Sequence, residues 1–255
     1  MSKRILGLIV ALLVVFSVPI ALSQMEQGEQ RVYTYVSQFQ VPRANWAQYA
    51  ENTEKTFVPI VEKLMADGTL IGWSTFETIV HTPDGYTHGS AWSSNSIAGL
   101  MKVLDEVRKS GPTPGQISST RHEDLLMQST MYHAAGSGSG TSGYARVICQ
   151  MEKPGKPGDY AAALKKYLWP TFEEQVKKGA ATSFALDEQY VNTGPQSLRC
   201  LVIDYPNAEG MDKWAAAINA TLGKLSQADR EALFGSTVPD SRRDFMFRVT
   251  HHAHK

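Results

Sequence analysis

The sequence predicts an α+β fold in which one chain of 255 residues contains two similar halves. The first observation is an internal repeat, in which every pair of matching positions is separated by 111 residues (160 minus 49). The second is that both halves give the same predicted order of elements: strand, helix, strand, strand, helix, strand. The repeated positions are Tyr49, Ala50, Lys55, Pro59, Glu62, Gly68, Trp73, Glu77 and Thr82, matched by Tyr160, Ala161, Lys166, Pro170, Glu173, Gly179, Phe184, Glu188 and Thr193.

The first half opens with a predicted strand over 32–41, which ends before the turn at Pro42. A helix follows over 45–66, because its apolar residues recur at spacings of three and four until Gly68 ends it. Strands near 69–80 and 86–93 flank the turn at 82–85 and form a hairpin. A second helix over 96–107 and a last strand over 124–133 complete this half.

The second half repeats this order. We expect strands over 144–151, 182–191, 197–204 and 245–251, with helices over 159–178 and 209–222. An additional short helix is predicted after Ser226, because Asp229 stands three positions later in a capping pattern. Each long first helix contains a proline, Pro59 or Pro170, and should bend there or satisfy its hydrogen bonds locally.

The order β-α-β-β-α-β is the split βαβ pattern of the ferredoxin-like fold. We therefore predict a first ferredoxin-like unit at 30–134 and a second at 143–255. A signal peptide at 1–23 is predicted to precede them. Gly and Ser dominate the segment between the two units, so 135–142 is expected to be a flexible linker. Two units of about a hundred residues are each too small for a large core, so they should pack together around a shared site.

The N-terminus predicts export to the periplasm or secretion. Lys3 and Arg4 precede a long apolar run that ends in small residues, as in a cleavable signal, although an uncleaved membrane anchor is the alternative. Removing these two basic residues leaves 23 Lys and Arg against 25 Asp and Glu, which argues against nucleic acid as a partner. Cys149 and Cys200 lie in neighbouring predicted strands, and two buried thiols are expected in preference to a disulfide.

The helix-to-strand passages FVPIVE…G…GW at 57–73 and WPTFE…G…F at 169–184, together with the doubled element order, resemble the dimeric α+β barrel superfamily. This superfamily includes antibiotic-biosynthesis monooxygenase-like, EthD-like and NIPSNAP-like families. The resemblance implies two ferredoxin-like units packed sheet against sheet, with helices outside and a pocket within the barrel. Here one chain would supply both units as a tandem duplication. Because the superfamily hosts many activities, it implies no particular reaction.

Strand alternation predicts which side chains enter that pocket. The faces expected inside comprise Tyr33, Tyr35, Ser37 and Phe39; Trp73, Thr75, Glu77 and Ile79; Tyr144, Arg146, Ile148 and Gln150; and Phe184, Leu186, Glu188 and Tyr190. Trp92 and His88 share a face of another strand and could reach the mouth. The ligand-binding candidates are accordingly Tyr33, Tyr35, Trp73, Trp92, Arg146 and Phe184.

The catalytic residues are unknown, with Glu77, Glu188 and His88 as candidates. A glutamate among aromatic rings favours its neutral form and can act as an acid or base, whereas a solvent-exposed or ion-paired one cannot. Arg146 could bind an anionic group of a ligand or pair with Glu188. His252 and His254 share a strand face and could form a metal pair, although a frayed tail is the favoured interpretation.

These observations favour an exported barrel that binds a small molecule, without a metal or other cofactor. We expect a monomer with an internal pseudo-dimer or a weak homo-oligomer, and no membrane association after signal cleavage. One alternative is a cofactor-independent monooxygenase or isomerase acting on an aromatic or polyketide-like substrate. The other alternative is a non-catalytic structural or interaction protein.

Overall fold

A computed structural model describes residues 31–82, 85–111, 119–195 and 197–255. Arg31–Lys255 forms one compact unit. The expected signal peptide at 1–23 lies outside the described residues, as does part of the turn predicted at 82–85. Within the described residues, no helix has both the length and the apolar character needed to cross a membrane.

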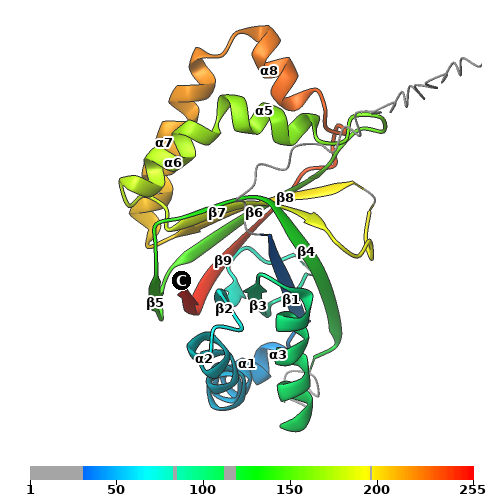
Figure 1. The fold of residues 1–255 in the computed structure, drawn as a ribbon, viewed down its shortest axis with the longest axis vertical. Coiled ribbons are helices and arrows are strands. Elements are labelled where there is room, and N and C mark those ends of the chain that lie inside the picture. Colours follow the sequence, from blue (N-terminus) through cyan, green and yellow to red (C-terminus); the bar gives the residue numbers. More distant parts are fainter. Residues whose placement is uncertain (1–30, 83–84, 112–118, 196) are drawn as a thin grey trace, which may run out of the picture. The chain divides into compact units, whose positions relative to one another are not determined.

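Eight antiparallel strands form a closed barrel (Figure 1). Their order is β2-β3-β1-β4-β7-β8-β6-β9, and pairing of β2 with β9 closes the ring. A short strand, β5 (Gly138–Gly140), adds to β9 beside the start of β6. The barrel strands are β1 (Val32–Gln40), β2 (Gly72–Thr78), β3 (His88–Ser94), β4 (Arg121–Ala134), β6 (Tyr144–Met151), β7 (Ser183–Gln189), β8 (Leu198–Tyr205) and β9 (Arg243–His254).

Both halves of the chain contribute their strands in the same spatial order. In the first half the second strand is followed by the third, first and fourth, as β2-β3-β1-β4. In the second half the corresponding order is β7-β8-β6-β9. The halves join at β4–β7 and at β9–β2, so the closed barrel requires both.

Helices cover the outside of the barrel on two sides (Figure 1). The first half supplies a 3-10 turn η1 (Arg43–Asn45), α1 (Trp46–Asn52), a π-helical turn η2 (Thr53–Phe57), α2 (Val58–Ala66) and α3 (Ile97–Lys109). The second half supplies α5 (Asp159–Tyr167), α6 (Trp169–Lys177), α7 (Ala208–Lys224) and α8 (Gln227–Phe234). Ser226 caps α8 by accepting a hydrogen bond from the Asp229 amide at 3.2 Å, which confirms the predicted capping pattern.

The two helix prolines stand where the helices change geometry, as expected. Pro59 lies in the first turn of α2, directly after the π-helical turn. Pro170 lies in the first turn of α6, where Leu168 separates that helix from α5. A proline in a first turn removes no intrahelical hydrogen bond, so a break just before it avoids the cost of an interior proline.

Many of the large aromatic residues of β1, β2, β3 and β7 pack under the helices. Tyr33, Trp73 and Trp92 belong to a cluster with residues of α2 and α3, and Phe184 and Leu186 belong to another with residues of α5, α6 and α7. The predicted inward and outward faces were therefore exchanged. Helices packed on the outer face of the sheet bury these large side chains closely, and the opposite faces are left to line the barrel.

The segment expected to be a flexible linker also differs from the sequence prediction. Gly138–Gly140 pairs with His252–His254, so β9 continues where a frayed tail was expected. A Cβ at Gly138 would lie 3.0 Å from the His254 ring, and one at Gly140 would lie 3.0 Å from the His252 ring. The glycines therefore serve as a flat surface for two imidazoles, a role that composition alone does not reveal.

Candidate functional site

The barrel encloses a cavity of about 870 Å³. Much of its wall is made by small or aliphatic residues, with Phe76, Phe245 and Phe247 among the aromatic residues that also line it. The small or aliphatic residues include Ala145, Val147, Ala185 and Val202 from the second half, and Val36 and Leu125 from the first half. The position of the pocket inside the barrel agrees with the expectation, but the residues that form it come from the opposite strand faces.

Two aspartates face this cavity from neighbouring strands. Asp187 on β7 is only 6% exposed and accepts a hydrogen bond from Ser129 Oγ at 2.6 Å. Asp204 on β8 is partly buried and accepts one from Ser183 Oγ at 2.5 Å. Both aspartates are held by neutral hydroxyls and retain acceptor capacity for a further partner.

Burial determines the ionisation of these groups. Loss of hydration raises the pKa of Asp187 to about 6, with the Asp204 charge adding to the rise and the Ser129 hydrogen bond opposing it. Burial also raises the pKa of Asp204, against the opposing effects of the Ser183 hydrogen bond and His254. Tyr132, which lines the same cavity, has its pKa raised by burial and by both aspartates. Asp187 therefore changes between neutral and negative near pH 6.

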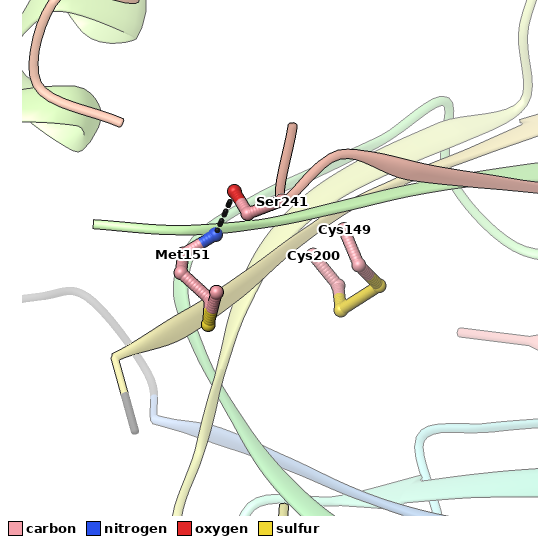
Figure 2. The surroundings of a disulfide bond; sticks show 4 residues. All are labelled: Cys149, Met151, Cys200 and Ser241. Atoms are coloured by element: carbon pink, nitrogen blue, oxygen red, sulfur yellow. Dashed lines mark hydrogen bonds between the residues drawn. A yellow bond between two sulfur atoms is a disulfide. The ribbon is translucent and has the colours of Figure 1, made fainter. Parts of the chain in front are cut away.

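The cavity wall contains a disulfide between Cys149 and Cys200 (Figure 2). The two residues lie directly opposite each other on β6 and β8. Nearby, the Met151 amide donates a hydrogen bond to Ser241 Oγ at 3.1 Å, which ties the segment before β9 to β6 (Figure 2). The expectation of two free thiols was wrong, because the strand register places the two cysteines side by side.

A second pocket of about 290 Å³ lies on the outer side of the sheet, beneath α1 and η2. It is lined by Glu77, His88 and Tyr49, among others. His88 is 6% exposed, and its ring centroid lies 4.9 Å from that of Trp46 and 4.7 Å from that of Tyr49. Burial, with smaller contributions from His81 and Arg43, lowers the pKa of His88 to about 4. The imidazole is therefore neutral across the physiological range.

The catalytic candidates are divided between this pocket and the surface. Glu77 and His88 are register partners on β2 and β3, so the structure brings these two together. Glu188 lines neither described pocket and forms an ion pair with Arg199. Arg199 also pairs with Glu152 at 2.9 Å. Glu188 is therefore part of a structural ion-pair network.

The ligand-binding candidates lie on the helix side. Tyr33, Trp92 and Phe184 are buried under helices, and Tyr35 stacks on Trp92 with ring centroids 4.7 Å apart. Trp73 reaches the cavity wall, but its side chain packs in the same helix-side cluster.

Arg146 pairs with Asp244 on β9, so the considered pairing with Glu188 is not formed. The sequence reasoning missed Asp187 and Asp204, although each is an acidic residue that directly follows an apolar run, at 184–186 and at 200–203. Such an interruption was the signal available for finding them.

Comparisons with known proteins agree with the fold. A provisionally named monooxygenase from Fusobacterium nucleatum superposes with a TM-score of 0.66 at 12% identity, over 88% of this chain and 94% of its own. A protein of the same description from Lactobacillus acidophilus gives a TM-score of 0.58 at 12% identity, over 88% of this chain and 96% of its own. An anthrone oxidase-like protein gives a TM-score of 0.54 at 10% identity, over 88% of this chain and 93% of its own.

These neighbours belong to the dimeric α+β barrel superfamily that the sequence resembles. The chain has the fold of that superfamily. No family model matches the sequence, and no curated protein matches it significantly. At identities of 10% to 12% the likeness establishes the fold, and the activity has to be argued from the pockets.

Proposed function

We propose that the protein binds a small, partly apolar molecule inside its barrel. The observation that carries the proposal is the cavity of about 870 Å³, walled by aliphatic, small and aromatic residues with polar groups among them. Sites for small molecules have this size and composition, roughly 300–1,000 Å³ with sparse polar groups that orient the ligand. Packed protein interiors leave few voids larger than a water molecule, so an internal space of this size favours an occupant.

The test is to look for a bound molecule and then to fill the cavity. Protein purified from its own host is analysed by native mass spectrometry for a mass excess that denaturation removes. Ala185→Phe, in the cavity wall, should abolish the excess, whereas Ala216→Phe on the exposed side of α7 should retain it. Absence of any ligand in the native protein, or equal occupancy in both variants, would contradict ligand binding in the cavity and favour a non-catalytic interaction role.

Two further parts of the proposal concern origin and location. The repeated strand order and the 111-residue sequence repeat support a tandem duplication of ferredoxin-like units at 30–134 and 143–255. The Cys149–Cys200 disulfide supports export, because disulfides persist mainly in oxidising compartments. Fractionation of the host, with the mature N-terminus read by mass spectrometry, tests cleavage near residue 23.

A second candidate function is cofactor-independent oxygenation or isomerisation in the smaller pocket. His88 supports it, because a buried neutral imidazole beside Glu77 can accept a proton from a carbon acid. The names of the structural neighbours, monooxygenase and anthrone oxidase-like, point to the same class of reaction. Oxygen uptake with an anthrone as the probe substrate tests it: activity should fall on His88→Gln and persist in Ala185→Phe.

A further inference from the structure

The barrel cavity has an excess of acidic groups. Its wall contains the carboxylates of Glu123, Asp187, Asp204 and Asp240. The basic groups in the wall are Arg243, His252 and His254. Arg243 is exposed and donates hydrogen bonds to the backbone carbonyls of Asp240 and Arg242, at 2.9 and 2.7 Å. Its interactions therefore lie at the rim of the cavity.

Asp187 is the most deeply buried of these carboxylates. Its negative charge is compensated differently from that of Glu152, a buried acid in the same half of the chain. Glu152, at 3% exposure, forms an ion pair with Arg199 at 2.9 Å and accepts the Gly158 amide at 3.1 Å. Within residues 31–82, 85–111, 119–195 and 197–255, no Lys or Arg forms an ion pair with Asp187 or Asp204. A buried carboxylate without a cation is costly, and the cost is removed when a ligand supplies the charge.

Aromatic surface lies in the same cavity. Tyr132 is 41% exposed and Phe245 is 43% exposed, and both belong to the cavity wall. Tyr132 is close enough to Asp187 and Asp204 to feel both charges. Aromatic faces attract cations and pack against apolar groups, so they complement both parts of an amphipathic amine.

We infer that the cavity selects molecules in which an apolar body carries a protonated amine, whose charge is balanced by Asp187. The inference rests on the proposed function, because it names the chemical class of the barrel ligand. The ammonium group would donate to the free lone pairs of Asp187, and the apolar body would lie against the aliphatic wall. Charge-assisted hydrogen bonds are roughly twice as strong as neutral ones, so a neutral analogue should bind less tightly.

The test compares three probes of one shape: protonated 1-naphthylmethylamine, neutral 1-naphthalenemethanol and anionic 1-naphthoate. Binding is measured by isothermal titration calorimetry at pH 7.5. The amine should bind roughly tenfold or more tightly than the alcohol, and the carboxylate should bind most weakly. Asp187→Asn should reduce amine affinity by roughly tenfold and leave the alcohol unchanged. Asp212→Asn, on the exposed side of α7, is the matched control and should change neither.

The outcomes separate the inference from the function on which it rests. If the alcohol or the carboxylate binds as tightly as the amine, the cavity binds ligands but the inferred charge selection is wrong. If no probe binds and Ala185→Phe leaves any native ligand in place, both proposals fail. Should Asp187→Asn fold poorly, the comparison of probes on the unmodified protein still decides the matter.

Discussion

Replacing Asp187 by Asn should make the protein more stable at neutral pH. The side chain is 6% exposed, and burial raises its pKa from the ordinary value of 3.8 to about 6. Above that value the folded protein contains a buried charge that the unfolded chain would hydrate. Asn keeps the shape and can still accept the Ser129 hydrogen bond, but carries no charge.

The size of the effect follows from the linkage between proton binding and folding. Between 3.8 and about 6 the folded state binds more protons at Asp187 than the unfolded state does, so stability falls as pH rises through this window. The difference of about two pKa units corresponds to roughly 3 kcal/mol as an upper bound. We therefore expect the free energy of unfolding of Asp187→Asn to exceed that of the unmodified protein by roughly 1–3 kcal/mol at pH 7.5. This difference should vanish near pH 4.

Urea unfolding of both proteins at pH 4, 5, 6 and 7.5, without reductant, measures this difference. The comparison has to be made between variants, because His88 acts in the opposite direction over an overlapping pH range. Its folded pKa of about 4 lies below the ordinary 6.5, so its contribution to stability is lost as pH falls. A variant that is less stable than the unmodified protein at pH 7.5, or a difference independent of pH, would refute the reasoning. Asp212→Asn, which alters an exposed carboxylate, should show no such trend.

Three other predictions concern single interactions. Cys200→Ser opens a disulfide that spans 51 residues and should cost roughly 2–4 kcal/mol in urea unfolding, and an unchanged midpoint would contradict a formed bridge. The unmodified protein should lose up to roughly 3 kcal/mol of unfolding free energy through His88 as pH falls from 6.5 to 4, and His88→Gln should remove this loss. If the loss persists in the variant, another group causes it. Glu152→Gln should cost roughly 3 kcal/mol and Glu188→Gln only about 1, because Glu152 is more deeply buried beside Arg199; equal thermal shifts would count against that ranking.

Local sequence patterns were enough to locate nearly every element of the fold. The helical period and the glycine after the first helix gave boundaries within a few residues of the start of α1, the end of α2 and both ends of α3 and α7. The resemblance led to the closed barrel, which the structure confirms. The helix and strand patterns depend on residues near one another in the chain, so a single sequence contains them.

The assignment of strand faces failed because alternation identifies two faces without saying which is inside. Aromatic side chains suited a ligand pocket, so the faces containing Trp73 and Phe184 were placed in the barrel. Their actual neighbours are helices, and the wall is left to residues such as Ala185 and Val202. Only the packing of helices against the sheet decides between the two possibilities, and that packing is a long-range property.

Alternation itself breaks down at the seam where the two halves meet. On β9, Phe247 and Val249 face the barrel cavity, so strict alternation would place His251 inside and His252 outside. The pairing of β2 with β9 shifts between Thr75 and Phe76 and leaves Thr250 as an extra residue. Such a bulge re-aims the side chains that follow it. Thr250 and His251 therefore both line the smaller pocket, while His252 and His254 turn into the barrel, where His254 lies close enough to Asp204 to lower its pKa. The imidazoles near the acidic end of the cavity are thus placed by one unpaired residue, which no count of strand periods along this sequence could reveal.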